Sequence, residues 1–211
     1  MIHLKLKRAI INILFIYLLY ACNIVNDTKT KIIRYENGDI QAEIQLKNNK
    51  KHGVAKLYHA NGNLESIQSY INDTIYGDAF FYNSFGELEK YSFFNFDGEL
   101  LFDCIYYEDS LVMDGQPIFI SIEKGSLDDI YINKEINIVL YGAKPPRIKH
   151  LISFFTFENN YENYIIQDKY PVYNVIFDNP GKKQIKVISR LIKDKTLYKS
   201  DTLIWNVLVT K

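Results

Sequence analysis

The chain has 211 residues, of which 47% are hydrophobic, 24% charged and 15% aromatic. This balance is ordinary for a globular protein and excludes a chain that is mainly disordered. The formal net charge is +0, and the sequence has no basic stripe to neutralise phosphates, which argues against a nucleic-acid partner. The 17 Tyr and 13 Phe residues suit half-buried pleated strands, so the composition favours β-structure.

The first 21 residues are organised like a bacterial export signal. Lys5, Lys7 and Arg8 precede the 13-residue segment 9–21, which is apolar except for Asn12. This length is typical of a secretory signal and falls short of the roughly 20 residues that span a bilayer. A permanent transmembrane helix is therefore the weaker interpretation. Removal of the segment leaves 22 basic against 25 acidic residues.

The end of this segment, Leu19-Tyr20-Ala21-Cys22, resembles the lipobox of bacterial lipoproteins, although Tyr20 replaces the small residue usual at its position. The resemblance implies that Cys22 receives a diacylglyceryl group on its sulfur and becomes the new N-terminus. Two or more acyl chains hold a protein at a membrane without spanning it. We therefore expect a cell-envelope lipoprotein at the inner or outer membrane, facing the periplasm or the cell surface. The alternatives are an uncleaved signal anchor and a secreted protein with an incidental cysteine.

The other cysteine is Cys104, so the mature chain has no second free thiol for an internal disulfide. It lies in the alternating run 101–107, and the sequence shows no nearby base or cationic pocket that would activate a thiol. We expect Cys104 to be a small buried hydrophobic residue.

After a polar linker at 22–31, glycines recur with a period of 24 residues. Two series show this period: Gly38, Gly62 and Gly86 in one, and Gly53 and Gly77 in the other. The pairs Asn37-Gly38 and Asn61-Gly62 predict type I′ hairpin turns, because that turn needs φ > 0 at both central residues. We expect residues 32–112 to form a meander of hairpins in one elongated sheet.

Along the repeat, an aromatic residue is followed by Asn-Gly, then a strand and then a second glycine. This order resembles the MORN-variant repeat. The pattern is carried by Tyr35-Glu36-Asn37-Gly38, by Lys51-His52-Gly53 and by residues 57–64, and the resemblance covers about residues 32–110. Phe85 replaces Asn in the third unit, which is the kind of change expected of a terminal capping unit. Proteins with such repeats are often grouped as YwqK-type antitoxins, which implies an antitoxin-like or immunity role as an alternative function.

One side of this sheet is expected to be packed by large side chains that recur along the strands. They are Leu57, Tyr58, Ile67, Tyr70, Phe80, Tyr82, Leu88, Tyr91 and Phe94. Aromatic strand residues usually pack in a core. Aromatic side chains that remain exposed would suit the binding of a partner.

The 24-residue period is lost in residues 113–211, where turn residues separate most of the strand-like runs. The predicted strands are 117–122, 135–141, 151–157, 170–177, 184–192 and 202–210. Six or seven short strands at this spacing predict a β-sandwich, with Trp205 in its core. The segment 177–187 and the strand that follows Ser200 resemble the last two strands of bacterial Ig-like and PKD-like domains, although Lys183 stands where those domains often carry Tyr.

The sequence shows no constellation typical of catalysis or metal binding. His52 and His59 are seven residues apart beside predicted turns, which places them on opposite faces of a strand and favours surface residues over a metal site. Carboxylates recur at turns and in the Asp128-Asp129 loop, which indicates a solvated rim. Phosphate loops and nucleophile elbows are not evident. We therefore expect no enzymatic activity and no cofactor.

The sequence thus predicts an all-β protein with a signal peptide at 1–21, a linker at 22–31, hairpin repeats at 32–112 and an Ig-like β-sandwich at 113–211. We expect a non-enzymatic envelope protein that binds membrane lipid through Cys22. Its sheets would bind an unknown protein or glycan partner. The residues that bind this partner are not identifiable from the sequence.

Overall fold

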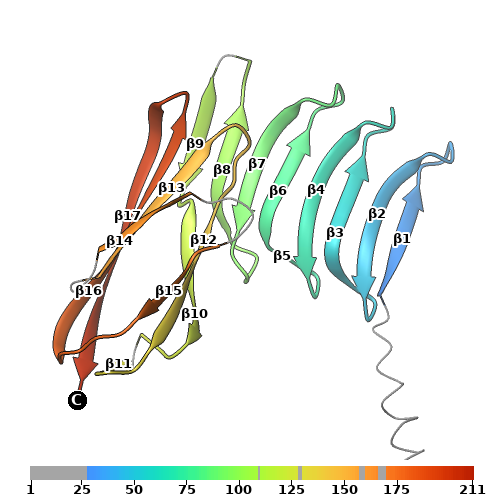
Figure 1. Ribbon diagram of the computed structural model, residues 1–211. Coiled ribbons are helices and arrows are strands. Elements are labelled where there is room, and N and C mark those ends of the chain that lie inside the picture. The colour runs from blue at the N-terminus through green and yellow to red at the C-terminus, as the bar shows by residue number, and fades with distance from the viewer. Residues whose placement is uncertain (1–27, 109, 128–129, 157–159, 166–169) are drawn as a thin grey trace, which may run out of the picture.

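The computed structural model describes residues 28–108, 110–127, 130–156, 160–165 and 170–211 (Figure 1). Cys22 and Asp128-Asp129 lie outside these ranges, as do the predicted signal peptide and most of the predicted linker. Within the described ranges the chain is all-β, which confirms the predicted fold class. No helix in those ranges is long and apolar enough to cross a bilayer.

Residues 28–115 form one antiparallel meander, here called the repeat sheet (Figure 1). Its strands follow the order β1-β2-β3-β4-β6-β7-β8-β9, and β5 pairs with β4. Their bounds are Thr28–Arg34 (β1), Ile40–Lys47 (β2), Lys50–Tyr58 (β3), Leu64–Ile71 (β4), Thr74–Ile75 (β5), Gly77–Tyr82 (β6), Leu88–Phe94 (β7), Leu100–Tyr106 (β8) and Leu111–Gly115 (β9). The sheet begins at Thr28, inside the segment predicted as a linker.

Two kinds of turn join the strands of the repeat sheet. At the first kind, the Gly38 N–H donates to the Tyr35 carbonyl (3.0 Å) and the Tyr35 N–H donates to the Asp39 carbonyl (2.9 Å). Gly38 has a φ of 93°, whereas Asn37 has no positive φ. This geometry is a type I turn followed by a glycine bulge. The predicted type I′ turns at Asn37-Gly38 and Asn61-Gly62 are therefore wrong, because the loop holds three residues instead of two.

Type I′ geometry occurs at the opposite ends of the strands. Asn48 and Asn49 have φ values of 52° and 63°, and Asn72 and Asp73 have values of 49° and 71°. These pairs close two-residue loops, as the pairing of Lys47 with Lys50 shows for the first. Asn and Asp tolerate positive φ better than other residues with a side chain, so local sequence explains these turns.

Large side chains of the repeat sheet are fully buried only near its C-terminal end, whereas the buried residues of β2, β3 and β4 are the small Ala42, Ala55 and Ser66. Tyr91 is 0% exposed, whereas Ile67 and Phe80 on the preceding strands are partly exposed. The predicted packed side is wrong because its residues divide between two faces. Ile67, Phe80 and Tyr91 are cross-strand neighbours on one face, whereas Leu57 pairs with Ser66 on the other.

Two further sheets follow the repeat sheet, with strand orders β10-β12-β15 and β11-β17-β16-β13-β14. Their bounds are Ile118–Lys124 (β10), Ile130–Tyr131 (β11), Ile136–Gly142 (β12), Lys149–Thr156 (β13), Asn160–Ile165 (β14), Val172–Val175 (β15), Gly181–Lys193 (β16) and Thr196–Thr210 (β17). The last hairpin extends beyond the strands predicted at 184–192 and 202–210. Asp194 and Lys195, with φ values of 50° and 67°, form a two-residue turn that lets the ladder continue to its end.

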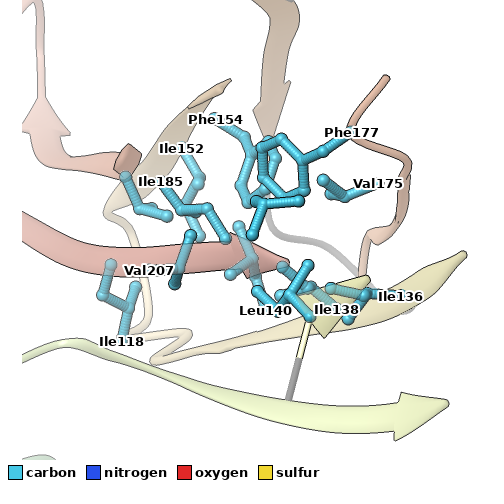
Figure 2. Close-up of a cluster of buried hydrophobic side chains, with 13 residues drawn as sticks. Ile118, Ile136, Ile138, Leu140, Ile152, Phe154, Val175, Phe177, Ile185 and Val207 are labelled. Atoms are coloured by element: carbon cyan, nitrogen blue, oxygen red, sulfur yellow. The ribbon is translucent and has the colours of Figure 1, made fainter. Parts of the chain in front are cut away.

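Side chains from both of these sheets form one hydrophobic core (Figure 2). Among its fully buried members are Ile118, Ile138, Leu140, Ile152, Phe154 and Ile185. Phe154 also stacks on Tyr173 with 4.2 Å between the ring centroids. Each such side chain contributes about 1.5–3 kcal/mol through burial. Trp205 packs against this core but remains partly exposed.

Candidate binding groove

The C-terminal end of the repeat sheet packs against the two sheets that follow it. The buried residues of this junction are Tyr91, Phe93, Phe102, Cys104, Ala143 and Leu191. Cys104 is 0% exposed, as expected for a small hydrophobic residue. Aromatic rings extend the contact: Tyr141 of β12 stacks on Phe119 of β10 at 5.0 Å and meets Phe96 of the β7–β8 loop edge-on at 4.8 Å. The junction therefore fixes how the repeat sheet sits against the second region.

A buried polar network lies within this junction. The Tyr91 hydroxyl donates a hydrogen bond to Asp78 Oδ1 and accepts one from the Lys144 N–H at 2.6 Å. The Lys144 ammonium lies 3.9 Å from Asp78 Oδ2 and 4.3 Å from the centroid of the Tyr170 ring. Burial raises the pKa of Asp78, and burial beside that carboxylate raises the pKa of Tyr91 well above its usual value. Tyr91 consequently stays protonated and links the two regions.

An open groove of about 1010 Å³ lies beside the junction. It is bounded by the β6–β7 loop, by Tyr107, Glu108 and Ser110 between β8 and β9, by the turn that contains Arg147 and by the end of β16. Tyr82, Tyr106 and Tyr107 contribute phenol rings to its lining. Because both regions supply lining residues, the groove depends on the junction.

Charges of opposite sign line different parts of the groove. Glu87, Glu89 and Glu108 come from the repeat sheet and its loops, whereas Arg147 and Lys193 come from the second region. The Glu87 carboxylate already accepts a hydrogen bond from the Asn83 side chain at 2.9 Å. In the part of the chain that the structure describes, neither cation forms an ion pair. The groove therefore offers hydrogen-bond acceptors on one wall and donors on the other.

The turn that carries Arg147 has an unusual backbone. The Ile148 N–H donates to the Pro145 carbonyl at 3.2 Å, and Arg147 has a φ of 64°. Arg147 is the third residue of the four-residue turn 145–148, a position that normally takes Gly or Asn when its φ is positive. The left-handed conformation costs other residues about 1–2 kcal/mol. The Tyr106 hydroxyl donates to the Pro146 carbonyl at 3.0 Å, and burial raises the pKa of that phenol. Tyr106 thereby ties the turn to β8.

The histidines are placed differently from the prediction. His52 is a half-buried residue of β3 instead of a surface turn residue, and His59 is half-buried with its Nε2 2.9 Å from the Tyr82 carbonyl. His150, which the sequence did not single out, is 1% exposed. Its Nδ1–H donates to the Ala143 carbonyl at 2.8 Å, and its Nε2 accepts from the Ser189 hydroxyl at 2.7 Å.

Burial lowers the pKa of His150 to about 4, so the ring stays neutral at pH 7. Its two hydrogen bonds join β13, β16 and the segment after β12, which is a structural role. Across the described ranges, no group of three His, Cys, Asp or Glu side chains is arranged to hold a metal ion.

One side-chain hydrogen bond between neighbouring units recurs with the 24-residue period. The Tyr35 hydroxyl donates to the Tyr58 carbonyl at 2.6 Å, and His59, one period later, contacts the Tyr82 carbonyl in the same way. In the third unit Asn83 instead bonds within its own loop, accepting from the Phe85 N–H at 3.0 Å. Among the described residues, the third loop therefore makes no side-chain bond to the carbonyl of the following unit like those of Tyr35 and His59.

Comparison with known proteins supports the repeat interpretation for part of the chain. The profile of the MORN repeat variant matches residues 51–72, which include β4 and all of β3 except its first residue, Lys50. None of the curated proteins matches the chain. Among solved structures, the extracellular domain of a putative one-component system from B. thetaiotaomicron aligns with 9% sequence identity and a TM-score of 0.31. The alignment covers 88% of this chain and 30% of that chain.

Proposed function

We propose that the protein is a non-enzymatic lipoprotein of the cell envelope that binds another envelope component, a protein or a glycan. The groove at the junction is the observation that carries this proposal. Its walls come from two regions that buried contacts hold together, so a ligand would meet a pre-formed site. Its lining includes three tyrosines and one arginine, which are residue types that dominate the energetics of binding surfaces.

The repeat sheet would act as a spacer between membrane and groove. β1 and β9 lie at opposite ends of the sheet (Figure 1). Neighbouring strands are about 4.8 Å apart, so β1 and β9 are separated by roughly 30 Å. A lipid attached to Cys22, six residues before β1, would therefore leave the groove well beyond the lipid headgroups.

The anchor is tested with a Cys22→Ala variant of the full chain in a bacterial host. We expect the loss of palmitate labelling and the release of the protein from the membrane fraction, because the acylated sulfur is removed. Cys104→Ala is the matched control and should keep both properties, because Cys104 is buried at the junction. Unchanged labelling and fractionation of Cys22→Ala would contradict the anchor.

The binding role is tested by capture of the tagged full chain from solubilised membranes of its own host. We expect a bound component that is retained by Tyr131→Ala, which changes an exposed tyrosine of β11, and lost by Tyr107→Ala in the groove. A component that both variants retain would place binding outside the groove. A captured toxin, with growth arrest when the protein is depleted, would instead support the antitoxin-like role that the repeat resemblance implies.

A further inference from the structure

We infer that the groove binds an uncharged oligosaccharide, and that Tyr107 and Arg147 contact it. This inference rests on the binding function proposed above and names the chemistry of the ligand. It depends on three observations: the phenol rings in the groove, the opposite charges of its walls and the strained backbone of Arg147.

The phenol rings offer flat apolar surfaces to a ligand. Tyr107 is 58% exposed, and Tyr82 and Tyr106 line the same groove. Leu88 and Leu111 add apolar surface beside them. A tyrosine ring supplies a large, rigid and amphipathic contact area at a low entropy cost. The C–H faces of sugar rings have the flat, weakly apolar shape that packs on such a ring.

The charges of the walls favour a ligand whose groups both donate and accept hydrogen bonds. Glu89 and Glu108 offer carboxylates that only accept, whereas Arg147 and Lys193 offer groups that only donate. A hydroxyl does both, so a polyol satisfies both walls. Three carboxylates among the lining residues disfavour a polyanion, and the two cations disfavour a polycation.

Most strands that line the groove disfavour an extended peptide. Strand addition requires an open backbone edge. Tyr82, Leu88 and Tyr106 lie on β6, β7 and β8, and each of these strands is paired on both sides, so a ligand over them meets side chains instead of free backbone groups. The exception is Leu111 on β9, which among the described strands pairs only with β8. The volume of about 1010 Å³ lies at the upper end of small-ligand sites and suits several linked sugar rings.

The third observation is the strained backbone of Arg147. Its φ of 64° is strained for any residue with a Cβ, and its guanidinium forms no ion pair among the described residues. Backbone strain of this kind often occurs at ligand sites, where the surrounding structure imposes it. A glycine at position 147 would relieve the strain, but it would remove the guanidinium N–H donors from this wall of the groove.

The test is affinity electrophoresis of the full chain, purified in detergent, through native gels that contain single polysaccharides. The neutral probes are a β-1,4-glucan, a β-1,3-glucan, an α-1,4-glucan, a xylan and a mannan, and the acidic probe is a polygalacturonate. We expect at least one neutral probe to retard the protein. Tyr107→Ala and Arg147→Gly should weaken that retardation about tenfold, whereas Tyr131→Ala should leave it unchanged. Raising NaCl from about 0.05 to 0.5 M should have little effect, because the ligand is uncharged.

Four results would overturn the inference. Retardation by the acidic probe alone, lost at high salt, would show an anionic ligand. Retardation that Tyr107→Ala and Arg147→Gly leave intact would place the glycan outside the groove. If no probe retards the protein while membrane capture yields a polypeptide that Tyr107→Ala loses, the ligand is a protein and the proposed binding function survives. If neither experiment yields a ligand, the inference and the proposed function both fail.

Discussion

Substitution of Tyr91 by Phe tests the polar network that holds the repeat sheet to the second region. The change removes one hydroxyl and keeps the buried ring, so it opens no large cavity. Asp78 then loses the hydrogen bond from Tyr91 while its carboxylate stays largely buried. A hydrogen bond to a charged group contributes about 1.5–3 kcal/mol. We expect the free energy of unfolding to fall by about that amount at pH 7.

The pH dependence of this loss has a defined sign. Burial raises the pKa of Asp78 in the folded protein, and the bond from Tyr91 opposes that rise. In Tyr91→Phe the pKa of Asp78 should therefore rise further. The folded state then holds its proton more tightly than the unfolded chain, so stability recovers as the pH falls through the raised pKa. The deficit should be largest at neutral pH and should shrink in acid.

The assay is urea denaturation of the full chain at several pH values, followed by far-UV circular dichroism and Trp205 fluorescence. Tyr70→Phe is the matched control, because the Tyr70 hydroxyl donates to the Gln68 side chain at 2.6 Å in a half-buried site away from the junction. It should cost less than about 1 kcal/mol. A loss in Tyr91→Phe of under about 0.5 kcal/mol, or a loss that does not change with pH, would show that the Tyr91 hydroxyl does not stabilise the buried Asp78 carboxylate.

Three further predictions concern stability. Gly115→Ala should lower the free energy of unfolding by about 2–5 kcal/mol, because an added Cβ would lie 2.0 Å from the Leu101 carbonyl oxygen at a φ of 83°. Gly38→Ala, where the added Cβ has open space, should lower it by about 1–2 kcal/mol in the same denaturation experiments. Arg147→Gly should stabilise by about 1 kcal/mol whereas Arg147→Ala should not, and equal effects would contradict the strain. Because His150 has a pKa of about 4 when folded and about 6.5 when unfolded, stability is fully present above pH 6.5 and about 3 kcal/mol is lost between pH 6.5 and 4; His150→Gln should flatten that slope in pH-dependent denaturation.

The hairpin repeats were predictable because their signals are local. A glycine at positive φ closes each three-residue loop, and the period of Gly38, Gly62 and Gly86 follows directly from that requirement. The turn type was mispredicted because Asn-Gly occurs in loops of two and of three residues, and the loop length depends on the strand register. The division of Leu57 and Ile67 between two faces was missed because the large residues were grouped without assigning a strand register. Leu57 pairs with Ser66 and Lys56 pairs with Ile67, and successive side chains of a strand point to opposite faces.

The groove was not predictable, because its residues are distant in sequence. Tyr82, Tyr107, Arg147 and Lys193 come from four separate segments that only the packed junction brings together. Each of them is an ordinary surface residue by its local pattern. His150 was missed because its neutral ring is defined by Ala143 and Ser189, which are 7 and 39 residues away. The repeat and the proposed anchor at Cys22 are features of the local sequence, whereas the groove arises from tertiary structure.

We propose that the groove of this envelope protein holds a ligand in the living cell. A photoreactive amino acid placed at Tyr107 in the full chain and irradiated in intact host cells would capture that ligand in place. The same amino acid at Tyr131 is the control, because that tyrosine is 48% exposed but lies outside the groove lining. We predict a covalent adduct in the membrane fraction from position 107 and none from position 131. Equal labelling from both positions, or no adduct from position 107, would contradict the account.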